Sequence, residues 1–151
     1  MHSKFLLIAL SALVFAVAAA RGADDDSAIL GTLGYTTGQS VLITHMAIGT
    51  LADAFYGKAY KSEEATSFVE TYINITKGLK EQMSKLITAD ALSKSDAKFI
   101  SNTVDVLDLV IEEAKDLKIY IESGDKSDAL AYDKSRKAAL KDIRTLLQMK
   151  D

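Results

Sequence analysis

Apolar residues recur at helical spacing along four stretches of this chain, and no stretch alternates between apolar and polar residues with a period of two. The four stretches run from about residues 40 to 60, 63 to 87, 94 to 122 and 127 to 149. Apolar positions three and four residues apart fall on one face of a helix, whereas a half-buried strand requires alternation. The pattern therefore predicts an all-α protein with four amphipathic helices.

Residues that typically begin and end helices support these boundaries. Ser62 is a suitable N-cap for the second helix, and Ser93 with Asp96 resembles a capping box for the third. Gly124 is expected to end the third helix, because glycine readily takes the left-handed conformation at that position. The connections are short, which makes consecutive helices antiparallel neighbours. We therefore predict an antiparallel up-down-up-down four-helix bundle over residues 39–151.

The stretch before the first helix, residues 21–38, is predicted to be a flexible lead-in. It begins with the acidic cluster Asp24 to Asp26 and continues with three glycines among threonines and a tyrosine. Glycine lowers the stability of a helix interior, and clusters of such residues are typical of loops.

Residues 1–20 resemble a secretory signal peptide. Lys4 makes the start basic, an apolar run follows from Phe5 to Val17, and Ala18-Ala19-Ala20 offers small residues for cleavage. The apolar stretch Phe5–Ala20 has 16 residues, which is shorter than the ~20 that span a bilayer. We therefore predict cleavage, no stable membrane anchor, and an extracytoplasmic location, either periplasmic or secreted.

Composition narrows the classes of function. The 18 basic and 21 acidic residues give a net charge of −3, which argues against nucleic acid as a partner because phosphate binding needs clustered lysine and arginine. The chain has no cysteine, so it can form neither disulfides nor thiolate metal sites. An exported protein without disulfides is more typical of a periplasm than of an extracellular module.

The first helix is apolar on more than one side. From Ser27 to Ala52 the chain has no Asp, Glu, Lys or Arg, and the face opposite the core stripe carries Ile43, Met46, Ala47 and Ala54. Such a helix requires cover on its second face. Two interpretations stand: residues 29–38 fold back over this face, or the face binds a protein partner or a second copy of the chain in a homo-oligomer.

Six polar residues fall on the predicted core faces. Counting outward from the turns places three of them, His45, Thr76 and Thr103, in one layer of the bundle, and it places Arg136 level with Glu113. A buried arginine needs a partner, so we predict an Arg136–Glu113 ion pair. The six residues are His45, Tyr72, Thr76, Thr103, Tyr132 and Arg136.

His45 gives the predicted core its one candidate ligand-binding position. Small residues follow it at Gly49 and Ala52, and a cavity there could admit a small ligand or haem. The candidate site comprises His45, Gly49, Tyr72, Thr76, Thr103 and Arg136. The simpler interpretation, which we favour, is that a threonine hydroxyl bonds to His45 and that Gly49 lets helices approach closely.

Motifs for catalysis are missing from the sequence. There is no Gly-x-Ser-x-Gly elbow and no Glu-x-x-His motif. One histidine without a carboxylate on the same predicted face does not make a metal site, so no metal and no cofactor are predicted. The sequence favours an exported, non-enzymatic bundle that acts by partner binding or self-assembly. The alternative is a bundle that binds a small ligand or haem through His45.

Overall fold

The computed structural model describes residues 23–88 and 92–149, and this part of the chain is all-helical, as predicted, with four helices and no strand. The helices are α2 (Ala23–Tyr56), α3 (Ser62–Ile87), α4 (Lys94–Ser123) and α5 (Lys126–Leu146). The predicted signal peptide lies outside the described residues. The chain divides into two compact units, residues 1–36 and 37–151, which are described separately.

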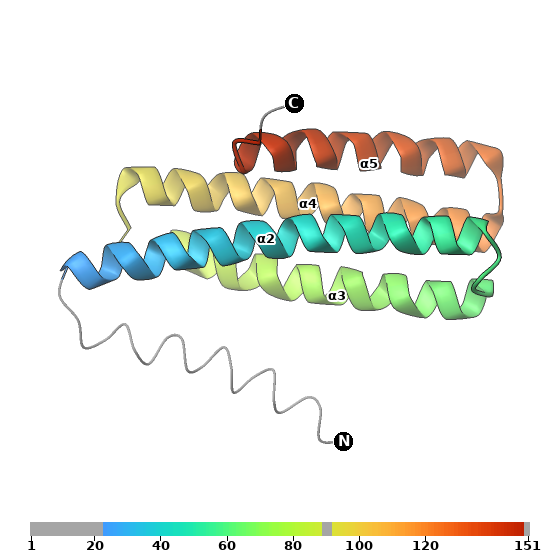
Figure 1. Ribbon diagram of the computed structural model, residues 1–151, viewed down its shortest axis with the longest axis horizontal. Helices are drawn as coiled ribbons and strands as arrows, with labels where there is room; N and C mark the ends of the chain where they lie inside the picture. The colour runs from blue at the N-terminus through green and yellow to red at the C-terminus, as the bar shows by residue number, and fades with distance from the viewer. Residues whose placement is uncertain (1–22, 89–91, 150–151) are drawn as a thin grey trace, which may run out of the picture. The chain divides into compact units, whose positions relative to one another are not determined.

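In the second unit the helices lie side by side as a bundle (Figure 1), with α4 packed against both α3 and α5. Apolar side chains from all four helices form one core, which includes Val41, Ile48, Val69, Met83, Val110, Leu117 and Ile143. The helices contribute unequally to this core. Ten residues of α4 are buried, compared with five of α3 and three of α5.

Helix α2 begins much earlier than the sequence predicts. The flexible lead-in expected over residues 21–38 is wrong from Ala23 onward, because this stretch is helical. Residues 29–38 continue α2 and therefore do not fold back over it. The chain has no proline to break the helix, and at Gly38 a side chain would collide with Leu147. This glycine therefore serves close packing between helices and does not mark a loop.

The caps of α4 agree with the sequence. The Ser93 side chain accepts a hydrogen bond from the Asp96 backbone N–H at 3.2 Å. Gly124 ends the helix in the left-handed conformation, with φ of 70°, and its N–H donates to the carbonyl of Tyr120 at 2.8 Å. Both predicted boundary residues of this helix are confirmed.

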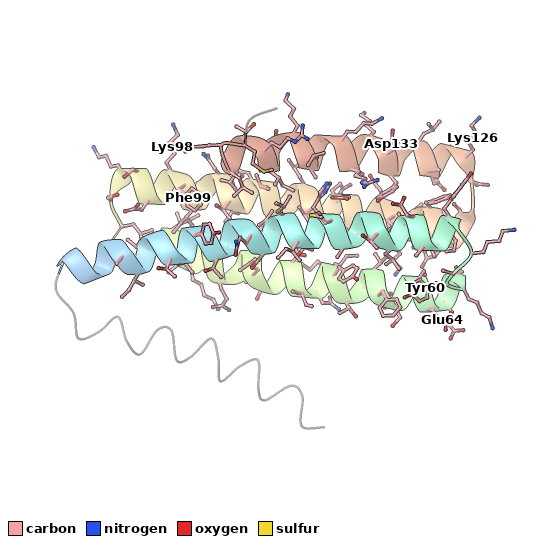
Figure 2. The ribbon with its side chains drawn as sticks, in the orientation of Figure 1. Tyr60, Glu64, Lys98, Phe99, Lys126 and Asp133 are labelled. Carbon is pink, nitrogen blue, oxygen red and sulfur yellow. The ribbon has the colours of Figure 1, made fainter. Side chains whose placement is uncertain are left out.

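The predicted cap of α3 is wrong by one residue. Lys61 occupies the N-cap position, and its backbone N–H donates to the Glu64 carboxylate at 3.1 Å. Ser62 instead donates its hydroxyl to the carbonyl of Ile121 at 2.9 Å, which ties the start of α3 to the end of α4. In Figure 2, Tyr60 and Glu64 lie together at this end of α3.

Two helices end before the predicted residue. Helix α2 ends at Tyr56 and not near Tyr60, and Lys58 follows with a positive φ of 59°. Helix α5 ends at Leu146 and not near Met149. Both differences concern the last turn, where helices fray and boundaries are least defined by the apolar pattern.

Ion pairs define the register between α3 and α4. Lys80 Nζ lies 2.6 Å from Asp108 Oδ1, and Lys118 Nζ lies 2.7 Å from Glu70 Oε1. Thr76 is therefore level with about Glu112, whereas Thr103 is level with about Lys85. The predicted layer that joins Thr76 with Thr103 is wrong, because counting from the turn misjudges the offset between these two helices.

Candidate functional site

A buried ion pair joins α2 to α4. His45 Nδ1 lies 2.8 Å from Glu113 Oε2, and the side chains of these residues are 5% and 0% exposed. When Glu113 is ionised, Nδ1–H donates this hydrogen bond, because a carboxylate can only accept. Among the described residues, His45 and Glu113 are the only buried side chains that can form an ion pair.

The helical repeat places both side chains in the core. On α4, Glu113 follows Val110 by three residues and precedes Leu117 by four, and both of these neighbours are fully buried. On α2, His45 lies three residues before the buried Ile48. Positions three and four apart share a helix face, so both residues occupy positions that apolar side chains would normally fill.

Arg136 of α5 fills the space beside Gly49 of α2. A Cβ atom at Gly49 would lie 2.5 Å from the guanidinium Nη2 and 2.9 Å from Cζ. The missing side chain of Gly49 therefore makes room for the arginine. The space beside Gly49, where the sequence suggested a ligand cavity, is occupied by the side chain of Arg136.

Burial raises the pKa of the Glu113 carboxyl above its usual value of 4.5. The hydrogen bond from His45 and the positive charges of His45 and Arg136 act in the opposite direction and lower this pKa, but burial has the larger effect. Arg136 acts through its charge, and no direct ion pair joins it to Glu113 in the described part of the chain. The predicted Arg136–Glu113 pair is thus corrected: the direct partner of Glu113 is His45.

Tyr132 extends this group on α5. Its side chain is buried, and both its hydroxyl and Glu113 Oε1 lack a hydrogen-bond partner among the described residues. Burial raises the pKa of the Tyr132 hydroxyl, and the negative charge of Glu113 raises it further. We refer to His45, Glu113, Tyr132 and Arg136 as the polar cluster.

The remaining predicted site residues do not join the polar cluster. Thr76 donates its hydroxyl to the carbonyl of Tyr72 at 2.7 Å, and Thr103 donates to the carbonyl of Phe99 at 2.8 Å. Neither threonine is the predicted partner of His45. Tyr72 is half-buried against the apolar core. The structure therefore joins His45, Gly49 and Arg136 and adds Glu113 and Tyr132, which the sequence analysis did not assign to this site.

A second candidate site is an exposed apolar surface on α2. Ile43 and Met46 are 64% and 59% exposed, and Ala47 and Ala54 are half-buried nearby. Ala47 follows Gly38, which faces α5, by about two and a half helical turns. Ala47 therefore lies on the side of α2 opposite the one that faces α5.

Helix α3 carries exposed apolar side chains as well. Phe68 and Ile75 are 44% and 60% exposed. Ile75 lies midway between Glu70 and Lys80, which both bind α4, so it points away from α4. The exposed and half-buried apolar residues of the two helices together form a set without charged side chains. We call this the uncharged surface, and it comprises Ile43, Met46, Ala47, Ala54, Phe68 and Ile75.

Searches for known kinds of site and relatives give no assignment. In residues 23–88 and 92–149, no group of three or more His, Asp or Glu side chains could hold a metal ion. None of the helices in the same ranges combines the length and apolar character that crossing a bilayer requires. No family model matches the chain, and no significant match is found among curated proteins or solved structures.

Proposed function

We propose that this chain is an exported, non-enzymatic helical bundle that acts by self-association through the uncharged surface. The observation that carries the proposal is the exposure of Ile43 and Ile75, which are 64% and 60% exposed and lie on neighbouring helices. Single exposed apolar residues are ordinary, whereas a contiguous apolar surface marks an interaction site.

Charge indicates which partner this surface fits. In a two-fold dimer, a surface meets a copy of itself, so any charge near the axis faces a like charge. The uncharged surface avoids this repulsion, and no charged residue interrupts the chain from Ser27 to Ala52. A charged partner would find no complementary group there. These two considerations favour a second copy of the chain.

Export is part of this proposal. It rests on the basic start at Lys4, the apolar run that begins at Phe5, and the alanines that end at Ala20. These features are typical of a cleaved signal peptide, and the function would then be exercised in a periplasm or outside the cell.

We further propose that the bundle has the antiparallel up-down-up-down order. Between α3 and α4, a residue later in one helix pairs with a residue earlier in the other, as in Glu70–Lys118 and Lys80–Asp108. Between α2 and α4, a residue later in one helix instead contacts a residue later in the other, as His45–Glu113 and Phe55–Tyr120 show. Both trends agree with this order, in which alternate helices are parallel.

A ligand or haem site at His45 has less support than self-association. Arg136 fills the space beside Gly49, where the sequence suggested a cavity. Haem would need an open space and a free imidazole nitrogen directed into it. We therefore do not adopt this alternative.

The test is analytical ultracentrifugation of the processed protein recovered from an exporting host. We expect a dimer, and we expect Ile43→Glu and Ile75→Glu each to convert it to a monomer by placing like charges at the interface. The matched control is Ile119→Glu on α4, because Ile119 is 50% exposed but lies outside the uncharged surface. This control is expected to remain dimeric.

Several outcomes would contradict the proposal. A monomer at every concentration, or a dimer that Ile119→Glu disrupts as strongly as Ile43→Glu, would show that the uncharged surface does not bind a second copy. A stable complex with a different protein on this surface would replace self-association by heteromeric binding. Recovery of the chain with residues 1–20 intact inside the cell would contradict export.

A further inference from the structure

A groove between α3 and α4 is lined mainly by charged side chains. Its volume is about 500 Å³, and Ile111 of α4, which is 5% exposed, forms part of its wall. On each helix the charged residues of the lining lie three, four or seven positions apart, so they share one face of that helix. These residues are Lys77, Lys80, Glu81 and Lys85 of α3 and Asp108 and Lys115 of α4.

Positive charge dominates this groove. Four lysines and two carboxylates line it, so its net charge is +2, whereas the whole chain has a net charge of −3. Lys80 and Asp108 pair at 2.6 Å and neutralise each other. Lys77 and Lys85 form no ion pair with a carboxylate of the described residues, although Glu81 lies between them in the sequence. A concave surface with an excess of one charge attracts ligands of the opposite charge, so the groove favours an anion.

The spacing of the two unpaired lysines indicates the length of this anion. Lys85 follows Lys77 by eight residues, which corresponds to about 12 Å along the axis of α3. A compact anion with a single charged group would bind closely to one of these ammonium groups only. A chain of linked anionic groups can reach both of them.

The composition of the lining indicates which anionic group fits. Among the described residues that line the groove there is no arginine, and it is the planar guanidinium that binds a carboxylate through two parallel hydrogen bonds. A lysine ammonium acts as a point charge and is a common partner of phosphate. The same residues include no aromatic ring, so a nucleoside base would have no stacking partner.

We propose that the groove between α3 and α4 binds a short chain of linked phosphates. Lys77 and Lys85 bind its two ends. Lys80 lies between them and becomes a third partner when the phosphate chain displaces Asp108, whose side chain is 53% exposed. The groove shares no residue with the uncharged surface, so this site goes beyond self-association and its test does not depend on the oligomeric state.

Isothermal titration calorimetry with inorganic tripolyphosphate at low salt tests this proposal. The double variant Lys77→Gln, Lys85→Gln removes both unpaired charges from the surface of α3. We expect its affinity to fall by up to about fivefold for each lysine removed. The matched control is the double variant Lys98→Gln, Lys134→Gln, which changes the net charge equally at exposed lysines outside the groove. This control is expected to bind as the wild type does.

A second pair of variants tests the competition for Lys80. Asp108→Asn releases the Lys80 ammonium from its partner, and we expect tripolyphosphate to bind up to about fivefold more tightly. Asp105→Asn makes the same change in net charge at an exposed residue of α4 outside the groove. It is expected to leave the affinity unchanged.

Four results would overturn the proposal. The first is an absence of binding by the wild type at low salt, and the second is an equal loss of affinity in the two lysine double variants. The third is orthophosphate binding as tightly as tripolyphosphate, because a single group would then suffice. The fourth is ATP binding more tightly than tripolyphosphate, because the base and not the phosphate chain would then be recognised.

Discussion

Helices of this bundle are joined by ion pairs of two kinds. Between α2 and α4, His45 and Glu113 meet inside the core, with side chains 5% and 0% exposed. Between α3 and α4, Lys80 and Asp108 meet at the surface at a shorter distance, with side chains 33% and 53% exposed. Water solvates the surface pair whether or not it forms, whereas the buried pair has exchanged that solvation for its own contacts. Burial, and not distance, therefore decides how much of the folding stability depends on each ion pair.

Breaking the buried pair should have the largest effect. His45→Ala leaves Glu113 buried with only the more distant charge of Arg136, and we expect the free energy of unfolding to fall by about 3–5 kcal/mol. His45→Asn is the matched control, because its side-chain amide can place a donor near the position of Nδ1. Urea denaturation of both variants measures the difference. Equal losses in the two would show that the hydrogen bond to Glu113 is not the cause.

Filling the space beside Gly49 should have the next largest effect. Gly49→Ala places a methyl group against the Arg136 guanidinium, 2.5 Å from Nη2, so the arginine must move. We expect a loss of about 1–3 kcal/mol in thermal or urea unfolding. Gly78→Ala is the control, because no atom lies within 4 Å of its added Cβ, and it should stabilise α3 by about 1 kcal/mol. A stabilising Gly49→Ala would contradict the assigned role of Gly49.

The pH dependence of stability sharpens the comparison. The pKa of Glu113 is raised above 4.5 in the folded protein by burial, so folding favours the protonated carboxyl. Its contribution to stability is complete below about pH 4.5 and is lost as the pH rises through the folded pKa. Relative to Glu113→Gln, the wild type should lose up to about 1.4 kcal/mol per pH unit in that interval.

Unfolding free energies measured at a series of pH values test this dependence. Glu112→Gln is the control, because the neighbouring Glu112 is exposed and pairs with Lys115 at the surface. It should follow the wild type at every pH. If Glu113→Gln instead loses stability in parallel with the wild type as the pH rises above 4.5, Glu113 is not the titrating group.

Breaking the surface pair should have the smallest effect. Lys80→Ala and Asp108→Ala should each change the free energy of unfolding by less than about 1 kcal/mol, and high salt should reduce even this difference. Urea denaturation at low and high salt measures it. A loss comparable to that of His45→Ala would contradict the argument that burial decides the importance of an ion pair.

The fold could largely be predicted from the sequence because helix periodicity and capping are local properties. Ser93 and Gly124 acted as expected. The start of α2 was missed because glycines are ambiguous: Gly38 resembles a loop residue in sequence, but in the structure it accommodates Leu147 of α5. Only the packing of a distant helix distinguishes these two uses of glycine.

The site was harder to predict because it depends on the offset between helices. Burial of His45 could be predicted from its position on α2, and burial of Glu113 was indicated by its spacing from Val110 and Leu117. The pairing of His45 with Glu113 could not be predicted, because α2 and α4 are not consecutive and no connecting turn fixes their register. Counting from the turns related His45 to Thr103, a residue nearly three turns away from its actual partner Glu113.

The uneven division of the core has a consequence for how the molecule opens. Ten residues of α4 are buried but only three of α5, so detaching the last helix exposes the least apolar area. Amide hydrogens of α5 should exchange with solvent deuterium first and those of α4 last. Partial opening would then begin at the carboxyl-terminal segment while the centre of the molecule stays closed.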